Sequence, residues 1–91
     1  MNGQKIKHLV LDVLKPHDPP LPDFAFFLGE LEGVTRVDVS LVEMDERTMS
    51  LRVMLQGTEI NFRELREHMG KQGAVIHSVD QVIVEKPPQM G

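Results

Sequence analysis

The sequence predicts an α+β fold in which one strand–helix–strand unit occurs twice. Four segments alternate apolar and polar residues with a period of two, and two stretches between them carry apolar residues at helical spacing. Each predicted helix closes on glycine before a strand that contains a Val-Asp pair, at Val37-Asp38 and at Val79-Asp80. The first copy runs from Ile6 to Met44 and the second from Met49 to Val84.

The first unit opens with a strand over Ile6–Leu14. Its two pleats carry Leu9, Leu11 and Val13 on one side and His8, Val10, Asp12 and Leu14 on the other. The segment KPHDPPLP cannot continue the strand because prolines lack a backbone donor, but it suits a loop before a helix with Asp18 as N-cap. The helix stripe consists of Leu21, Phe24, Phe27, Leu28 and Leu31, and Gly33 is the predicted stop.

A hairpin with an acidic tip joins the two units. Its first strand covers Val34–Met44, with Val37, Val39 and Leu41 inward and Asp38, Ser40, Val42 and Met44 outward. The turn DERT leads into the second strand, with Met49, Leu51, Val53 and Leu55 inward and Ser50, Arg52, Met54 and Gln56 outward.

The second helix has the clearest predicted start. Asn61 and Glu64 form a capping-box pattern, and Ile60 and Leu65 occupy the hydrophobic-staple positions. The core face comprises Phe62, Leu65 and Met69, and Gly70 and Gly73 end the helix. A long fourth strand over Ala74–Lys86 follows and is stopped by two prolines, so we expect residues 87–91 to be a flexible tail.

These elements predict one domain over residues 1–91, with its core in 6–86. Right-handed crossovers give a ferredoxin-like βαββαβ plait: a four-stranded antiparallel sheet in the order 4-1-3-2, with the central pair expected to be parallel. Both helices lie on one face. No further segment is left to cover the other face, so its residues matter most for function.

Composition excludes several classes of protein. The chain has no cysteine, which removes thiol nucleophiles and cysteine metal sites, and its net charge of −4 does not favour nucleic-acid binding. The polar start and short apolar strand predict neither a signal peptide nor a membrane span, so we expect a cytoplasmic protein. We also expect no enzymatic activity, because the proline-rich first strand–helix loop has no phosphate-binding glycines or arginine and no catalytic set is apparent.

The strings LVLDVLKPHDP, LEGV, LVEMD and GAVIHSVDQVIV resemble signature stretches of an archaeal family of small proteins, the domain-of-unknown-function family numbered 211. The resemblance covers Leu9 to Val84, and its most specific pieces are the Lys15-Pro16-His17 turn and the strand over residues 75–80. It implies a ferredoxin-like fold, closed homo-oligomeric assembly and divalent-cation binding.

The uncovered sheet face predicts self-association. An antiparallel sheet with one solvated face alternates more strictly than this one, and burial of each apolar side chain is worth about 1.5–3 kcal/mol. Scattered surface hydrophobes are the alternative. The expected apolar set is Val10, Leu14, Val42, Met44, Met54, Ile76, Val82 and Val84, around Asp12, Asp38, Ser40, Arg52, Ser78 and Asp80. We expect Val10, Asp12, Leu14, Val42, Met44, Arg52, Met54 and Ile76 to form the interface between copies.

Two assignments of charged and titratable groups stay open. Asp12 fits an ion pair with Arg52 across the sheet or a metal ligand. His17 ends the first strand and His77 begins the fourth, so the two imidazoles, completed by Asp18 or Asp80, fit a site for a divalent metal such as Cu, Zn or Ca. Alternatively, one histidine holds the proline-rich turn by hydrogen bonds.

The acidic tip offers a second candidate cation site at Glu43, Asp45 and Glu46, although a solvated acidic turn explains the same residues. The sequence therefore predicts a homo-oligomer, as a ring or an extended assembly, that binds a divalent metal at a His/Asp site. The alternative is a regulatory small-ligand module, similar to amino-acid-sensing plaits, with its ligand held by the first strand–helix loop.

Overall fold

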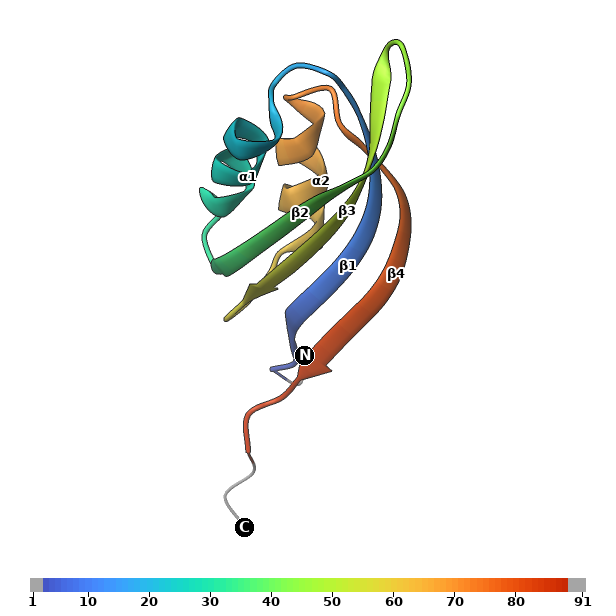
Figure 1. Ribbon diagram of the computed structural model, residues 1–91. Coiled ribbons are helices and arrows are strands. Elements are labelled where there is room, and N and C mark those ends of the chain that lie inside the picture. The colour runs from blue at the N-terminus through green and yellow to red at the C-terminus, as the bar shows by residue number, and fades with distance from the viewer. Residues whose placement is uncertain (1–2, 89–91) are drawn as a thin grey trace.

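The computed structural model describes residues 3–88, which form a four-stranded antiparallel sheet with two helices on one face (Figure 1). Along the chain the elements are β1 (Lys5–Pro16), α1 (Leu21–Gly29), β2 (Val34–Met44), β3 (Thr48–Gly57), α2 (Phe62–Gly70) and β4 (Val75–Glu85). The sheet order is β2-β3-β1-β4, which read from the other edge is 4-1-3-2. The ferredoxin-like plait predicted from the sequence is confirmed.

The prediction that the two central strands are parallel is wrong, because β1 and β3 pair antiparallel. The crossover through α1 makes β1 and β2 run in the same direction, and the hairpin then reverses β3. Since β3 lies between β1 and β2, every neighbouring pair in the sheet is antiparallel.

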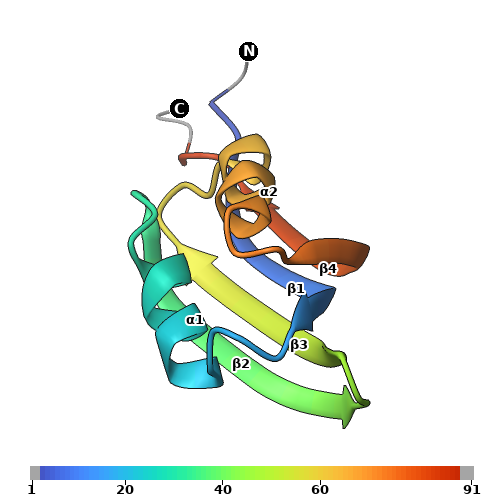
Figure 2. The same ribbon diagram turned by 90° about the horizontal axis from the view of Figure 1, so that it is seen from above.

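The helices cover what we call the inner face of the sheet, and the opposite side is the open face (Figure 2). Both helices have nine residues, and no helix within residues 3–88 is long and apolar enough to cross a membrane. Their apolar stripes meet alternate residues of β1 and β3. The fully buried core comprises Leu11, Val13, Phe24, Leu28, Leu51, Val53, Leu55, Leu65 and Met69, each with 0% of its surface exposed.

The predicted N-cap of α2 is confirmed, whereas that of α1 is wrong. Asn61 caps α2 as expected, because its side-chain oxygen accepts a hydrogen bond of 3.0 Å from the backbone N–H of Glu64. Asp18 does not cap α1; the N-cap position is Pro20, whose side chain makes no capping hydrogen bond. The helix ends at Gly29, four residues before the predicted stop at Gly33.

Gly33 instead permits a close approach of two backbone segments. Its φ is +91°, and a Cβ added there would lie 2.0 Å from the carbonyl oxygen of Glu59. Its own carbonyl accepts a 2.8 Å hydrogen bond from the N–H of Thr58. The entry to β2 is therefore fixed against the exit from β3 by contact between main chains.

Two residues of β4 have no direct partner in its register with β1. Val13 pairs with Ile76 and Asp12 with Ser78, which leaves His77 extra, and the next shift leaves Asp80 extra. Each is a β-bulge, which inserts one residue and changes the alternation of the strand. Residues on either side of a bulge keep to the face of their partners, so Ile76 and Val79 both lie on the inner face with Val13 and Leu11.

The bulges correct four placements on the outward face. Ile76, Val82 and Val84 lie on the inner face, because they pair with Val13, Leu9 and Ile6, which are part of the core or pack against it. Met44 pairs with buried Met49 and is also inner, because Val42 is an extra residue of β2 in its register with β3. A strict period of two cannot reveal inserted residues, so the sequence pattern placed these side chains on the wrong side.

We predict that Gly33→Ala lowers the free energy of unfolding by more than about 1 kcal/mol, because alanine disfavours positive φ and its methyl group would overlap the carbonyl of Glu59. Gly70→Ala is the matched control, since an added Cβ there meets nothing within 4 Å. The control should be neutral or slightly stabilising. Urea unfolding of both variants measures the difference; equal stabilities would show that the Gly33 contact does not constrain the fold.

Candidate functional site: the open face of the sheet

Five predicted interface residues lie together on the open face, in the middle of the two central strands. On β1 they are Val10, Asp12 and Leu14, and on β3 they are Arg52 and Met54. Val10 pairs with Met54 and Asp12 with Arg52, so they form adjacent rows. We call these five residues the central patch. No helix or loop within residues 3–88 covers this face (Figure 1); Leu14 is 41% exposed, whereas Val10 is only 6% exposed.

The charged members of the central patch, Asp12 and Arg52, lie opposite each other but do not form an ion pair. Within residues 3–88 the ion pair is between Lys5 and Glu59. Asp12 also pairs in register with Ser78, and Arg52 with Ser40. The two charges therefore keep hydrogen-bonding capacity for groups outside the subunit. Asp38 lies opposite Met54, one row away from Asp12 and Arg52.

Polar side chains flank the central patch near His8 and along β2, while Val75 of β4 lies opposite Leu14. His8 hydrogen-bonds through Nε2 to the side chain of Gln81 at 2.9 Å, and its Nδ1 lies 3.4 Å from Nε2 of Gln56. On the β2 side the hydroxyl of Ser40 donates to Asp38 at 3.5 Å. An apolar centre with a hydrogen-bonded rim is the anatomy of protein interfaces.

The two histidines of the predicted metal site do not form a cluster with carboxylates. His17 lies in the loop after β1, and its Nε2 is 2.7 Å from the carbonyl oxygen of Asp45 at the hairpin tip. His77 and Asp80 are the bulged residues of β4, and Asp80 accepts a 2.7 Å hydrogen bond from Ser78. Within residues 3–88 no group of three or more His, Asp or Glu side chains could hold a metal ion. A metal at these residues would need ligands from a second copy.

At the acidic tip, the Asp45 carboxylate closes the turn. Its Oδ1 accepts hydrogen bonds from the N–H groups of Arg47 and Thr48 at 3.0 and 2.9 Å, and the Thr48 hydroxyl donates to it as well. These bonds to the charged form lower the pKa of Asp45. Glu43 and Glu46 are exposed beside it. Asp45, one of the three residues of the second candidate cation site, thus has a structural role in the turn.

Lys15 has a role that the sequence did not reveal. Only 1% of its surface is exposed, its Nζ donates to the carbonyl oxygen of Pro16 at 2.7 Å and to that of Pro19, and it lies 5.4 Å from the ring centre of Phe24. Burial lowers the pKa of Lys15, and the nearby Asp18 opposes this effect. The signal was available, because Lys15 continues the inner pleat of Leu9, Leu11 and Val13 into a loop rich in prolines.

His68, which lay outside the predicted sites, connects the two helices. Its ring stacks on Phe27 with centroids 3.7 Å apart, and its Nε2 is 2.7 Å from the Phe27 carbonyl oxygen. The imidazole is therefore engaged within the helix layer and is not part of the open face.

We predict that Lys15→Met lowers the free energy of unfolding by about 1–3 kcal/mol, because two carbonyl groups lose their donor while the apolar volume is kept. Lys7→Met is the matched control on the same strand: its Nζ donates to the carbonyl of Thr58 at an exposed position, so its effect should stay within about 0.5 kcal/mol. Thermal and urea unfolding provide the measurement. If Lys15→Met is no worse than Lys7→Met, the buried amine does not hold the loop.

We predict that the amide signals of Arg47 and Thr48 titrate with a midpoint below 3.8, the ordinary aspartate value, because the folded turn binds the charged form of Asp45. The stabilisation of the turn is present above the unfolded pKa and is lost as the pH falls through the lowered folded pKa. A pH series of amide spectra measures it. Asp45→Asn should abolish this titration, whereas Glu46→Ala should retain it; a midpoint at 3.8 or above would contradict the assignment.

Comparison with known proteins confirms the family resemblance of the sequence strings. The family model described as DUF211, uncharacterized ArCR, matches residues 7–87. The chain is also 37% identical over 86 residues to the uncharacterized protein MJ0319 of Methanocaldococcus jannaschii, an alignment that covers 94% of this chain and 87% of that protein. With a match that spans both strand–helix–strand units, the chain belongs to the DUF211 family.

Proposed function

We propose that this protein is a homo-oligomeric module whose copies bind one another through the open face, with the central patch in the middle of the contact. The observation that carries the proposal is the arrangement of this face. Val10 and Met54 pair directly, Leu14 lies two residues beyond Asp12 on the same face, and hydrogen-bonded polar side chains flank them. Val10 is already only 6% exposed, so a partner would mainly remove the accessible parts of Leu14 and Met54 from water.

The charges of the central patch favour a second copy as the partner. Asp12 and Arg52 carry opposite signs at neighbouring positions, so the patch is electrostatically complementary to itself. In a two-fold interface the same surface is used on both sides, and such a patch can then pair each charge with its opposite. Pairing is required, because a buried unpaired charge costs several kcal/mol.

A divalent cation belongs to this proposal as a ligand shared between copies. His77 and Asp80 project from bulges of an edge strand, where groups of a neighbouring subunit could complete the coordination. Imidazole and carboxylate suit borderline divalent metals such as Zn²⁺ and Cu²⁺. The alternative, a small ligand in the first strand–helix loop, has less support, because Lys15 already binds the carbonyl groups of that loop.

We predict that Met54→Lys dissociates the assembly and leaves the secondary structure of the subunit unchanged, because it places a charge at the centre of the open face. Light scattering after size exclusion, with and without a chelator, measures the mass, and circular dichroism checks the fold. Glu67→Lys, an exposed change on α2, is the control and should retain the mass of the wild type.

An oligomer of unchanged mass and affinity in Met54→Lys would show that the copies meet elsewhere, and a monomeric wild type would refute self-association. A chelator-dependent mass would support the shared cation. A mass that is unaffected by chelator and by added Zn²⁺, Cu²⁺ or Ca²⁺ would remove the cation from the assembly.

A further inference from the structure

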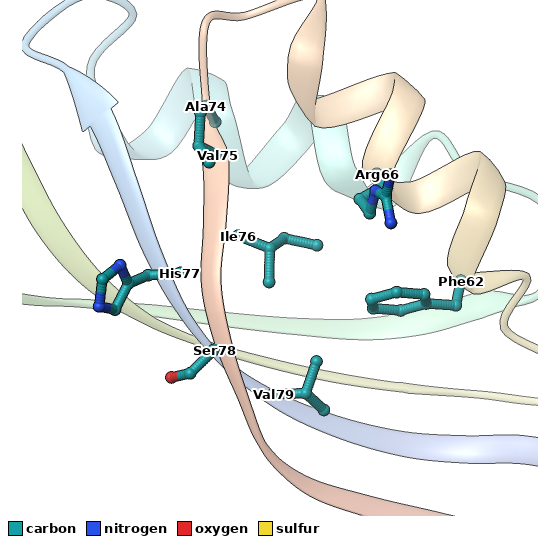
Figure 3. A pocket seen from close by; sticks show the side chains of 8 residues that line it. All are labelled: Phe62, Arg66, Ala74, Val75, Ile76, His77, Ser78 and Val79. Atoms are coloured by element: carbon teal, nitrogen blue, oxygen red, sulfur yellow. The ribbon is translucent and has the colours of Figure 1, made fainter.

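A groove with a cavity volume of about 580 Å³ lies between α2 and the beginning of β4, away from the open face (Figure 3). Its lining residues are Phe62, Arg66, Ala74, Val75, Ile76, His77, Ser78 and Val79. Cavities that hold small molecules have volumes of roughly 300–1,000 Å³. The groove is therefore of the right size for a small organic ligand.

Four side chains face one another across the groove. Phe62 and Arg66 are four residues apart on α2 and so lie on the same side of the helix. On β4, Ile76 and Val79 point toward them, whereas His77 and Ser78 point the other way (Figure 3). Residues three apart on a regular strand would face opposite sides; the bulge at His77 turns both apolar side chains toward α2.

Arg66 gives the groove a local positive charge. Its guanidinium makes no ion pair or hydrogen bond to another group within residues 3–88, and none of the eight lining residues is acidic. A guanidinium presents a planar fork of donors that matches a carboxylate in bidentate geometry. Beside it, Phe62, Ile76 and Val79 offer an aromatic and aliphatic surface.

We propose that this groove binds a small organic carboxylate with an apolar tail. The carboxylate pairs with Arg66, and the tail lies between the ring of Phe62 and the side chains of Ile76 and Val79. One charged group that fixes orientation within an otherwise apolar lining is the usual composition of a small-ligand site. A phenyl group in the tail would also gain an offset or edge-to-face contact with Phe62.

The edge of β4 favours a small molecule over an added strand from another protein. A strand that joins a sheet edge needs a regular row of free backbone groups, and bulges at His77 and Asp80 interrupt that row. The ligand also does not depend on the open-face contact, because the groove lies on the helix side of the sheet.

The experiment uses 4-phenylbutyrate as the probe and 4-phenylbutyramide as its neutral counterpart. Both are titrated into the full chain, with affinity measured by calorimetry and location by amide chemical shifts. We expect the acid to bind about tenfold or more tightly than the amide, since only the acid forms the charge-assisted pair. The shift changes should centre on residues 62–66 and 74–79.

The variants separate the charge from the apolar surface. Arg66→Gln should weaken binding of the acid by about tenfold or more and leave the affinity for the amide unchanged. Arg63→Gln, which removes a charge from the same helix outside the groove, is the matched control and should bind like the wild type. Val79→Glu should abolish binding of the acid, because a carboxylate in the groove occupies Arg66; its partly exposed position lets the fold persist.

Several results would overturn the proposal. Equal affinities for acid and amide, an unaffected Arg66→Gln variant or shift changes confined to the open face would each remove the carboxylate site. Phenyl phosphate binding as tightly as 4-phenylbutyrate would contradict the carboxylate class. A change in assembly mass in Arg66→Gln would make the groove a contact between subunits instead.

Discussion

The pairing of β4 with β1 is the constraint on which both surfaces of the molecule depend. Two extra residues on β4 allow three of its apolar side chains, Ile76, Val79 and Val82, to point toward the helices over a stretch in which strict alternation would divide them. α2 is short and covers only part of this stretch, so Val79 and Val82 remain 42% and 48% exposed. The same bulges remove Ile76, Val82 and Val84 from the open face, where Val75 and Ile83 of β4 remain opposite Leu14 and His8.

The helix layer is fixed to the sheet near both ends of β3. At the end that pairs with the start of β2, Gly33 allows main chains to touch, and the carbonyl of Gly33 binds Thr58. At the other end, Lys15 lies opposite Met49 and binds the carbonyl groups that precede α1. His68 on Phe27 links the two helices between these points. Polar contacts at the ends thus position the helices, and the apolar core fills the space between them.

The sequence was sufficient for the fold because the hydrophobic periods, the Asn61 cap and the turn residues favour one topology, even though the predicted cap and stop of α1 were wrong. Alternation also placed Val10, Leu14 and Met54 correctly, since β1 and β3 pair without a register shift there. It failed at Ile76 and Met44, because a bulge is defined by the partner strand and leaves no mark in the local pattern. The burial of Lys15 was missed although its pleat points inward, because lysine is ordinarily exposed and its acceptors are carbonyl groups of a loop.

The two proposed surfaces lie on different sides of the sheet but meet at the edge strand β4, because His77 lines the groove and is also a proposed ligand of the shared cation. The central patch is on the open face, whereas Ile76 and Val79, the apolar wall of the groove, face the helices. Copies that pair through the open face would direct their helices, and with them Arg66, away from the contact. A ligand could then enter the groove without displacing a neighbour bound to the open face, but a neighbour held by a cation at His77 would lie beside the groove. Coupling between the two events would have to pass through β1 and β4, whose shared register sets the side chains of both surfaces.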